Sequence, residues 1–213
     1  MCKVDAVILA GAPPEAGMVV PDEYPSRAMA QIAGKTMLQW VVDAARGASH
    51  VSRVVAVGKV TAQGLDLILD PSDSFLGNVM RGIEVCEGNY ALVVSSDIPL
   101  ITADMVDDFL SRAIKSGSDM CYPIIPKALC EANYPMLKRT YLKTKEGIFT
   151  GGNMLLLSRE FCFRNEHQIA QAYAMRKKPL SLAAKIGFDV LVRTVLAQIG
   201  FGSLLPIPVL ENA

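Results

Sequence analysis

The aspartate at the end of an apolar run is the residue best suited to chemistry in this sequence. Asp97 closes the stretch "YALVVSSD", in which residues 90–96 are typical of a buried strand, and Pro99 limits further strand pairing. A carboxylate at such a strand end can hold Mg²⁺, which prefers one or two carboxylates together with phosphate oxygens and water. The alternative is a structural role, since aspartate also favours turns and caps them.

Cationic side chains offer a complementary chemistry. Arg27 and Lys35 flank an apolar stretch just before a predicted helix, and two cations at a strand-end crevice can clamp a triphosphate. Arg139 lies in the basic segment "LKRTYLKTK", which is suited to a phosphorylated substrate in an otherwise neutral protein. The alternative for each of these cations is an ordinary place on the solvated surface.

Two glycine-containing segments complete the candidate set. In "TGGNM" the glycines permit close approach of a ligand, and Asn153 offers a carbonyl oxygen to a cation; a β-bulge or bend is the alternative. The segment "LAGAPPEAG" follows an apolar run, yet it matches neither G-x-x-x-x-G-K-[ST] nor G-x-G-x-x-G. Classical P-loop and dinucleotide-binding sites are therefore excluded.

Alternating strands and helices must position these residues. Strands are predicted at residues 4–10, 51–58 and 90–96, and helices at residues 35–48, 75–88 and 102–117. This alternation predicts a parallel sheet with right-handed crossovers, in which ligands bind beyond the carboxyl ends of the strands. Gly11 and Asp97 both follow such ends and are expected at one edge of the sheet.

The second half of the chain has a different pattern. Strands are predicted at residues 119–127 and at 148–158, where two glycines interrupt the run. A long apolar helix is predicted at residues 180–200, and its charges at Lys185, Asp189 and Arg193 favour a packed amphipathic helix over a membrane span.

Composition limits the class of protein. The 213 residues suit one domain over residues 1–213, and the formal net charge of zero argues against a nucleic-acid partner. The five cysteines lack the close spacing of zinc or redox motifs, which favours reduced thiols in the cytoplasm. The N-terminus lacks a signal-peptide pattern, and no membrane partner is expected.

The order of the motifs resembles a known family. "VDAVILAG", "SRAMAQIAGKTMLQWVVDA", "GNVMRGIE" and "YALVVSSDIPLIT" are similar to the MobA-like NTP transferases of the nucleotide-diphospho-sugar transferase superfamily. "YPIIPK", "KRTY" and "EGIFTGGNMLLL" resemble a bacterial branch of that group. The resemblance implies a three-layer α/β/α sandwich, Rossmann-like and of the GT-A type, with a mainly parallel sheet.

The resemblance also implies roles for individual residues. Arg27, in place of the family's lysine, and Lys35 would be the catalytic cations, and Asp97 and Asn153 would bind the metal, with Ser96 replacing the glycine of the family's G-D-x-P motif. Arg139 is the candidate for the acceptor side. The implied nucleotide-binding residues are Leu9, Ala10, Gly11, Ala12, Gly77 and Asn78.

The implied reaction is the transfer of an NMP from an NTP to a small phosphorylated acceptor, with Mg²⁺ as cofactor and pyrophosphate as product. The sequence departs from the family where Ala12 replaces the second glycine and a longer, proline-containing segment follows. The family's D-x-D-x-x-E-D-L-like segment does not follow residue 200, so C-terminal truncation is one expectation.

Two other functions remain open. One is a GT-A glycosyltransferase that uses a nucleotide sugar, although "SSD" does not supply its D-x-D motif. The other is a non-catalytic nucleotide-binding protein. The oligomeric state is open as well, with a homodimer among the possibilities.

Overall fold

The computed structural model describes residues 4–174, which form two compact units. Within the described residues, the first unit comprises residues 4–122 and 153–164, and the second comprises residues 123–152 and 165–174. The helix predicted at residues 180–200 lies outside the described residues. The prediction of a single domain over residues 1–213 stays a prediction.

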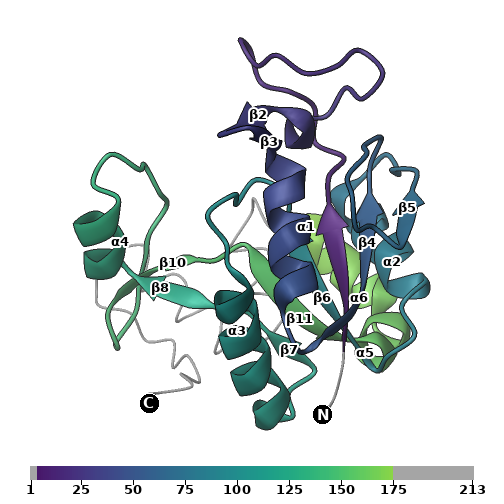
Figure 1. Ribbon diagram of the computed structural model, residues 1–213. Coiled ribbons are helices and arrows are strands. Elements are labelled where there is room, and N and C mark those ends of the chain that lie inside the picture. Colours follow the sequence, from purple (N-terminus) through teal and green to yellow (C-terminus); the bar gives the residue numbers. More distant parts are fainter. Residues whose placement is uncertain (1–3, 175–213) are drawn as a thin grey trace. The chain divides into compact units, whose positions relative to one another are not determined.

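The first unit is built on a six-stranded sheet with the strand order β5-β4-β1-β6-β11-β7 (Figure 1). Its strands are β1 (Val4–Leu9), β4 (Val51–Val57), β5 (Leu67–Leu69), β6 (Tyr90–Ser95), β7 (Met120–Cys121) and β11 (Met154–Ser158). The pairs β5·β4, β4·β1 and β1·β6 are parallel, whereas β11 runs antiparallel to both β6 and β7. The predicted, mainly parallel sheet is therefore confirmed.

Helices cover both faces of this sheet. Ile8 of β1 packs in a core cluster with α1 (Met37–Gly47) and α3 (Ala103–Ser116), whereas Val7 packs in a second cluster with α2 (Phe75–Glu84) and α5 (Arg159–Arg164). Successive side chains of a strand point to opposite faces, so β1 contributes to both clusters. The three-layer α/β/α architecture is confirmed (Figure 1).

Polar caps fix where the helices begin. The side-chain oxygens of Thr36, Ser74 and Thr102 accept hydrogen bonds from backbone N–H groups in the first turns of α1, α2 and α3. Helix α3 ends at Gly117, whose φ of +64° is the left-handed conformation that glycine adopts readily. The helix predicted at residues 102–117 is confirmed, with Thr102 and Gly117 as its two caps.

The second unit contains a small antiparallel sheet. Its elements are β8 (Ile124–Pro126), β9 (Leu142–Lys143), β10 (Ile148–Gly151), α4 (Lys127–Asn133) and α6 (Glu166–Ala174), and β10 pairs with both β8 and β9. The single strand predicted at residues 119–127 is wrong, because the chain forms β7 and β8 in different sheets with Pro123 between them. Proline has no N–H to continue a strand ladder.

Other short elements also differ from the sequence predictions. The predicted interruption of residues 148–158 is confirmed, since β10 and β11 belong to different sheets. The prediction lacked α4, β5, the 3₁₀ helix η1 (Arg27–Met29) and the hairpin of β2 (Gln31–Ile32) and β3 (Lys35–Thr36). These elements are too short to give a clear hydrophobic period.

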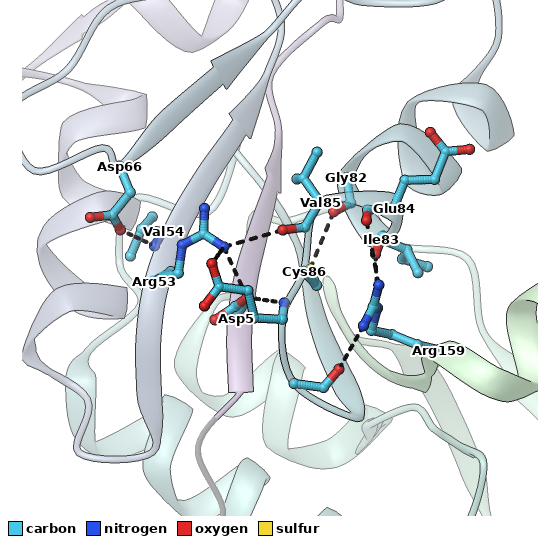
Figure 2. Close-up of polar contacts among 12 residues, drawn as sticks. Asp5, Arg53, Val54, Asp66, Gly82, Ile83, Glu84, Val85, Cys86 and Arg159 are labelled. Atoms are coloured by element: carbon cyan, nitrogen blue, oxygen red, sulfur yellow. Dashed lines mark hydrogen bonds and ion pairs between the residues drawn. The ribbon is translucent and has the colours of Figure 1, made fainter.

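The edge of the sheet at the amino end of β1 is held by polar contacts around a buried aspartate. The Asp5 side chain is buried; its Oδ2 accepts a hydrogen bond from the Glu87 N–H at 2.8 Å and lies 3.7 Å from Arg53 Nη1 (Figure 2). Arg159 donates to the carbonyls of Ile83 and Glu84 at the end of α2 (Figure 2). These contacts join β1 to β4 and to the turn after α2, join α5 to α2, and serve the fold.

A carboxylate on α3 makes the fold sensitive to acid. Asp107 accepts hydrogen bonds from the N–H groups of Ser49 and His50 at 2.8 and 3.0 Å. Burial would raise its pKa, but these bonds and the His50 ring outweigh that effect and lower the pKa to about 2. The stabilisation is therefore present above the unfolded-state pKa and is lost as the pH falls through the folded-state value.

We expect Asp107→Asn to lower the free energy of unfolding by about 1–2 kcal/mol at pH 6 and to have little effect at pH 2. Urea unfolding across that pH range measures the difference. Asp108→Asn is the matched control, because Asp108 is exposed and contacts Arg112 within the same helix. If the free energy of unfolding depended equally on pH in the wild type and in Asp107→Asn, Asp107 would not be the source of the acid sensitivity.

Candidate functional site

A cleft of about 270 Å³ lies at the carboxyl ends of β1 and β6. Its lining residues are Leu9, Gly11, Ala12, Arg27, Ser72, Asp73, Ser74, Phe75, Asn78, Ser95 and Ser96. Segments far apart in sequence meet here because the parallel strands end at the same edge.

Among the described helices, none is long and apolar enough to cross a membrane.

The loop after β1 is closed at its base by two hydrogen bonds. The buried Ser26 hydroxyl donates to the Ala10 carbonyl at 2.6 Å, and the Arg27 N–H donates to the Ala12 carbonyl at 3.0 Å. Residues 13–25 thus leave the sheet edge and return to it as a closed loop. This closure places Arg27 beside the end of β1, although the two are well separated in sequence.

Arg27 lies between two carboxylates. Its Nη2 is 3.0 Å from Asp97 Oδ2, and its Nη1 donates to Glu15 Oε1 at 2.9 Å. The Nε–H is buried and has no hydrogen-bond partner among the described residues. An unpaired buried donor is unfavourable, so the guanidinium gains a bond if it can turn toward a further acceptor.

The opposite wall is formed by the start of α2 and the segment before it. Asn78 Oδ1 accepts from the Ser72 N–H at 2.6 Å and from its hydroxyl at 3.0 Å. A backbone N–H can only donate, which settles the orientation of the amide: the Nδ2 group faces away from Ser72 and toward Gly11. The cleft therefore presents an amide donor on this wall.

Three glycines allow this close packing. A Cβ on Gly77 would stand 2.3 Å from the Ser72 hydroxyl, and a Cβ on Gly11 would stand 3.2 Å from Asn78 Nδ2. Gly77 packs against Ser72 and Ser74, which line the cleft, and is not itself among the lining residues. Gly58, which has a φ of +155°, packs against the Ala10 backbone, where a Cβ would stand 2.5 Å from the carbonyl oxygen.

Asp97 and Asn153 both lie beside Ser95. The Ser95 hydroxyl donates to Asp97 Oδ1, and the Ser95 backbone N–H donates to the backbone carbonyl of Asn153 at 3.0 Å. The described residues contain no group of three or more His, Cys, Asp and Glu side chains suited to a metal. A single carboxylate completed by ligand oxygens and water is a donor set that suits Mg²⁺.

Two predicted cations are engaged elsewhere. Lys35 Nζ lies 2.6 Å from Asp43 Oδ2 and 4.6 Å from the centre of the Trp40 ring, and Lys35 is not among the residues that line the cleft. Arg139 belongs to the second unit, where its Nη1 donates to the Gly151 carbonyl at 3.0 Å. The catalytic role of Lys35 and the acceptor role of Arg139 stay predictions.

The sequence predictions lacked the lining residues Ser72, Asp73, Ser74, Phe75 and Ser95 and three residues that shape the site. Ser26 and Gly58 shape the backbone at the end of β1, and Glu15 binds Arg27. Gly58 carried a signal, since it ends a predicted strand next to the first one. Ser26 and Glu15 carried none, because a loop of mixed composition does not reveal which of its side chains fold back.

Solved structures resemble this chain over most of its length. A hypothetical transferase from Thermus thermophilus is 31% identical, with a TM-score of 0.74, and the match covers 96% of this chain and 84% of that one. A CMP:2-keto-3-deoxy-manno-octonic acid synthetase complexed with CTP is 15% identical, with a TM-score of 0.55, and the match covers 77% and 78% of the two chains.

A 2-C-methyl-D-erythritol 4-phosphate cytidylyltransferase, also from Thermus thermophilus, has a TM-score of 0.53 and 18% identity, and the match covers 82% of this chain and 77% of that one. The likeness to the synthetase and to the cytidylyltransferase concerns the fold alone. No curated protein matches the sequence. The family model for the MobA-like NTP transferase domain matches residues 6–181, and the chain therefore belongs to the MobA-like NTP transferase family.

Proposed function

We propose that this protein transfers a nucleoside monophosphate from an NTP to a small phosphorylated acceptor. A phosphate oxygen of the acceptor attacks the α-phosphorus and forms a new P–O bond. The bond between the α-phosphorus and the bridging oxygen breaks, and pyrophosphate leaves with that electron pair. Such a reaction needs alignment and charge neutralisation more than covalent help from protein groups.

The observation that carries this proposal is the place of Arg27. Its guanidinium lines the cleft beside Gly11 and Ala12 and is bound to Asp97, so a cation and a carboxylate meet where strand ends bind ligands. A guanidinium offers a planar fork of donors that matches phosphate oxygens. Arg27 would hold the phosphates and stabilise the charge that develops on pyrophosphate.

Asp97 and Asn153 would hold the Mg²⁺ proposed for this site. The bound ion would neutralise charge on the phosphate oxygens. The Ser95 hydroxyl, which donates to Asp97 Oδ1, would keep the carboxylate oriented. We further propose Lys35 as a second cation for the triphosphate and Arg139 as a residue for the acceptor.

The nucleoside would lie against Leu9, Gly11, Ala12 and Asn78. The Asn78 Nδ2 group can only donate, and it suits a hydrogen-bond acceptor of the base, such as O2 or N3 of cytosine. One similar solved structure holds CTP and another is named a cytidylyltransferase. We therefore place CTP first among the nucleotides to be tested.

The direct test is pyrophosphate release from CTP, GTP, UTP and ATP, each with a panel of sugar phosphates and other small phosphorylated alcohols. We expect one NTP to give turnover that stops when EDTA removes the divalent cation and returns when Mg²⁺ is added. Calorimetric binding of the same NTPs is measured in parallel. Binding without pyrophosphate release would favour a non-catalytic nucleotide-binding protein. The absence of both NTP binding and pyrophosphate release would refute the proposal.

A further inference from the structure

The long loop after β1 places a carboxylate on the cationic group of the cleft. The Glu15 carbonyl accepts from the Met18 N–H at 3.0 Å, which closes a four-residue turn. Gly17, the third residue of that turn, has a φ of +85°, the conformation that a type II turn requires there. The turn holds Glu15 at the point of the loop from which its side chain reaches Arg27.

The ion pair between Glu15 and Arg27 affects the charge that a ligand meets. Glu15, Arg27 and Asp97 together carry two carboxylates and one guanidinium, so their formal charges sum to minus one. The Glu15 side chain is 65% exposed, whereas that of Arg27 is 28% exposed. Glu15 can therefore leave into solvent, while Arg27 stays at the cleft.

A bare triphosphate faces two costs at this cleft. It must displace Glu15 from Arg27 to gain a guanidinium, and it is repelled by the carboxylate that remains nearby. A triphosphate that carries Mg²⁺ has less negative charge to be repelled, and its metal ion compensates Asp97. The arrangement thus discriminates between two forms of the same nucleotide.

We infer that Glu15 is a specificity-determining residue, which makes the cleft favour the Mg²⁺-complexed NTP over the metal-free NTP by competing for Arg27. This inference rests on the proposed function, since it concerns the same phosphate site. It explains why the loop after Ala12 contains a turn that carries a carboxylate. Glu15 acts through Arg27 and does not itself contact the metal ion.

The test compares dissociation constants for the tightest-binding of the four NTPs, measured by calorimetry in EDTA and in Mg²⁺. For Glu15→Gln we expect the metal-free NTP to bind roughly two- to fivefold more tightly than to the wild type, which is the range of an exposed ion pair. The affinity for the Mg²⁺ complex should rise less. Glu15→Asp should retain part of the discrimination.

Asp22→Asn is the matched control, because Asp22 lies in the same loop and its replacement makes the same change in net charge. An equal gain in affinity for the metal-free NTP in Glu15→Gln and Asp22→Asn would show a general charge effect and overturn the inference. A weaker affinity of Glu15→Gln for the Mg²⁺ complex would mark Glu15 as a metal ligand and would also overturn it. NTP binding by the wild type with no change in Glu15→Gln would overturn this inference alone, whereas no binding of any NTP to the wild type would refute the proposed function as well.

Discussion

Asp97→Ala is expected to lower Mg²⁺-dependent pyrophosphate release at least about 100-fold, because even residues that only support metal ligands commonly affect metal sites by 10- to 100-fold. Asp97 is the carboxylate bound to Arg27 at the cleft and the proposed ligand of the metal ion. Its removal leaves Arg27 paired with Glu15 alone. Steady-state kinetics and calorimetric binding of the Mg²⁺–NTP complex measure the two effects separately.

The structural consequences of the same substitution should be small. The Asp97 side chain is 28% exposed, and an ion pair in that environment contributes about 1 kcal/mol or less to the free energy of unfolding. Asp104→Ala is the control, since Asp104 is an acid in the first turn of α3 and its replacement makes the same charge change. Unchanged turnover in Asp97→Ala, or an equal loss in Asp104→Ala, would remove Asp97 from the proposed mechanism.

Gly58→Ala is expected to lower the free energy of unfolding by about 2–4 kcal/mol, the sum of overpacking and of a backbone conformation that alanine rarely adopts. A Cβ at this position would stand 2.5 Å from the Ala10 carbonyl oxygen and 3.0 Å from the Gly11 nitrogen. Both are backbone atoms at the start of the candidate site and cannot rotate away. Thermal and urea unfolding measure the loss.

Gly117→Ala is a reference for backbone strain without a side-chain contact. Gly117 has a φ of +64°, but a Cβ there would meet nothing within 4 Å, so only the backbone strain of about 1 kcal/mol is expected. The excess loss in Gly58→Ala then reports the contact with the strand-end loop together with the greater strain of alanine at a φ of +155°. We also expect the folded fraction of Gly58→Ala to bind NTP more weakly, since Ala10 and Gly11 must shift. Equal losses of stability in the two variants would show that the contact is unimportant.

The general plan of the fold could be predicted from the sequence because its elements have strong local signals. The apolar run at residues 4–10 and the helical periodicity around Trp40 and Met80 are periodic enough to identify strands and helices directly. Short elements without a period, such as β2, β3, β5 and α4, were missing from the prediction. Their formation depends on neighbours that bring a partner strand or a covering surface.

The residues of the candidate site also fall into those that the sequence could predict and those that it could not. Gly11 and Asp97 could be assigned to one edge because any parallel strands end together, and the structure places both at that edge. The distinction between Arg27 and Lys35 could not be predicted, since both are cations near the start of α1. Arg27 reaches the cleft through the backbone bond to Ala12, whereas Lys35 binds Asp43 and Trp40.

The sequence by itself determined the alternation of strands and helices, the edge of the sheet at which a ligand is expected and the resemblance to a nucleotidyl-transferring family. These properties follow from hydrophobic period and residue order, which are local. Only the tertiary structure decided that Glu15 and Asp97 share Arg27, that Asn78 presents its donor to the cleft, and that Gly58 supports the first loop. Each of these contacts joins residues whose separation is set by loop closure and strand order, and no local pattern encodes such a distance.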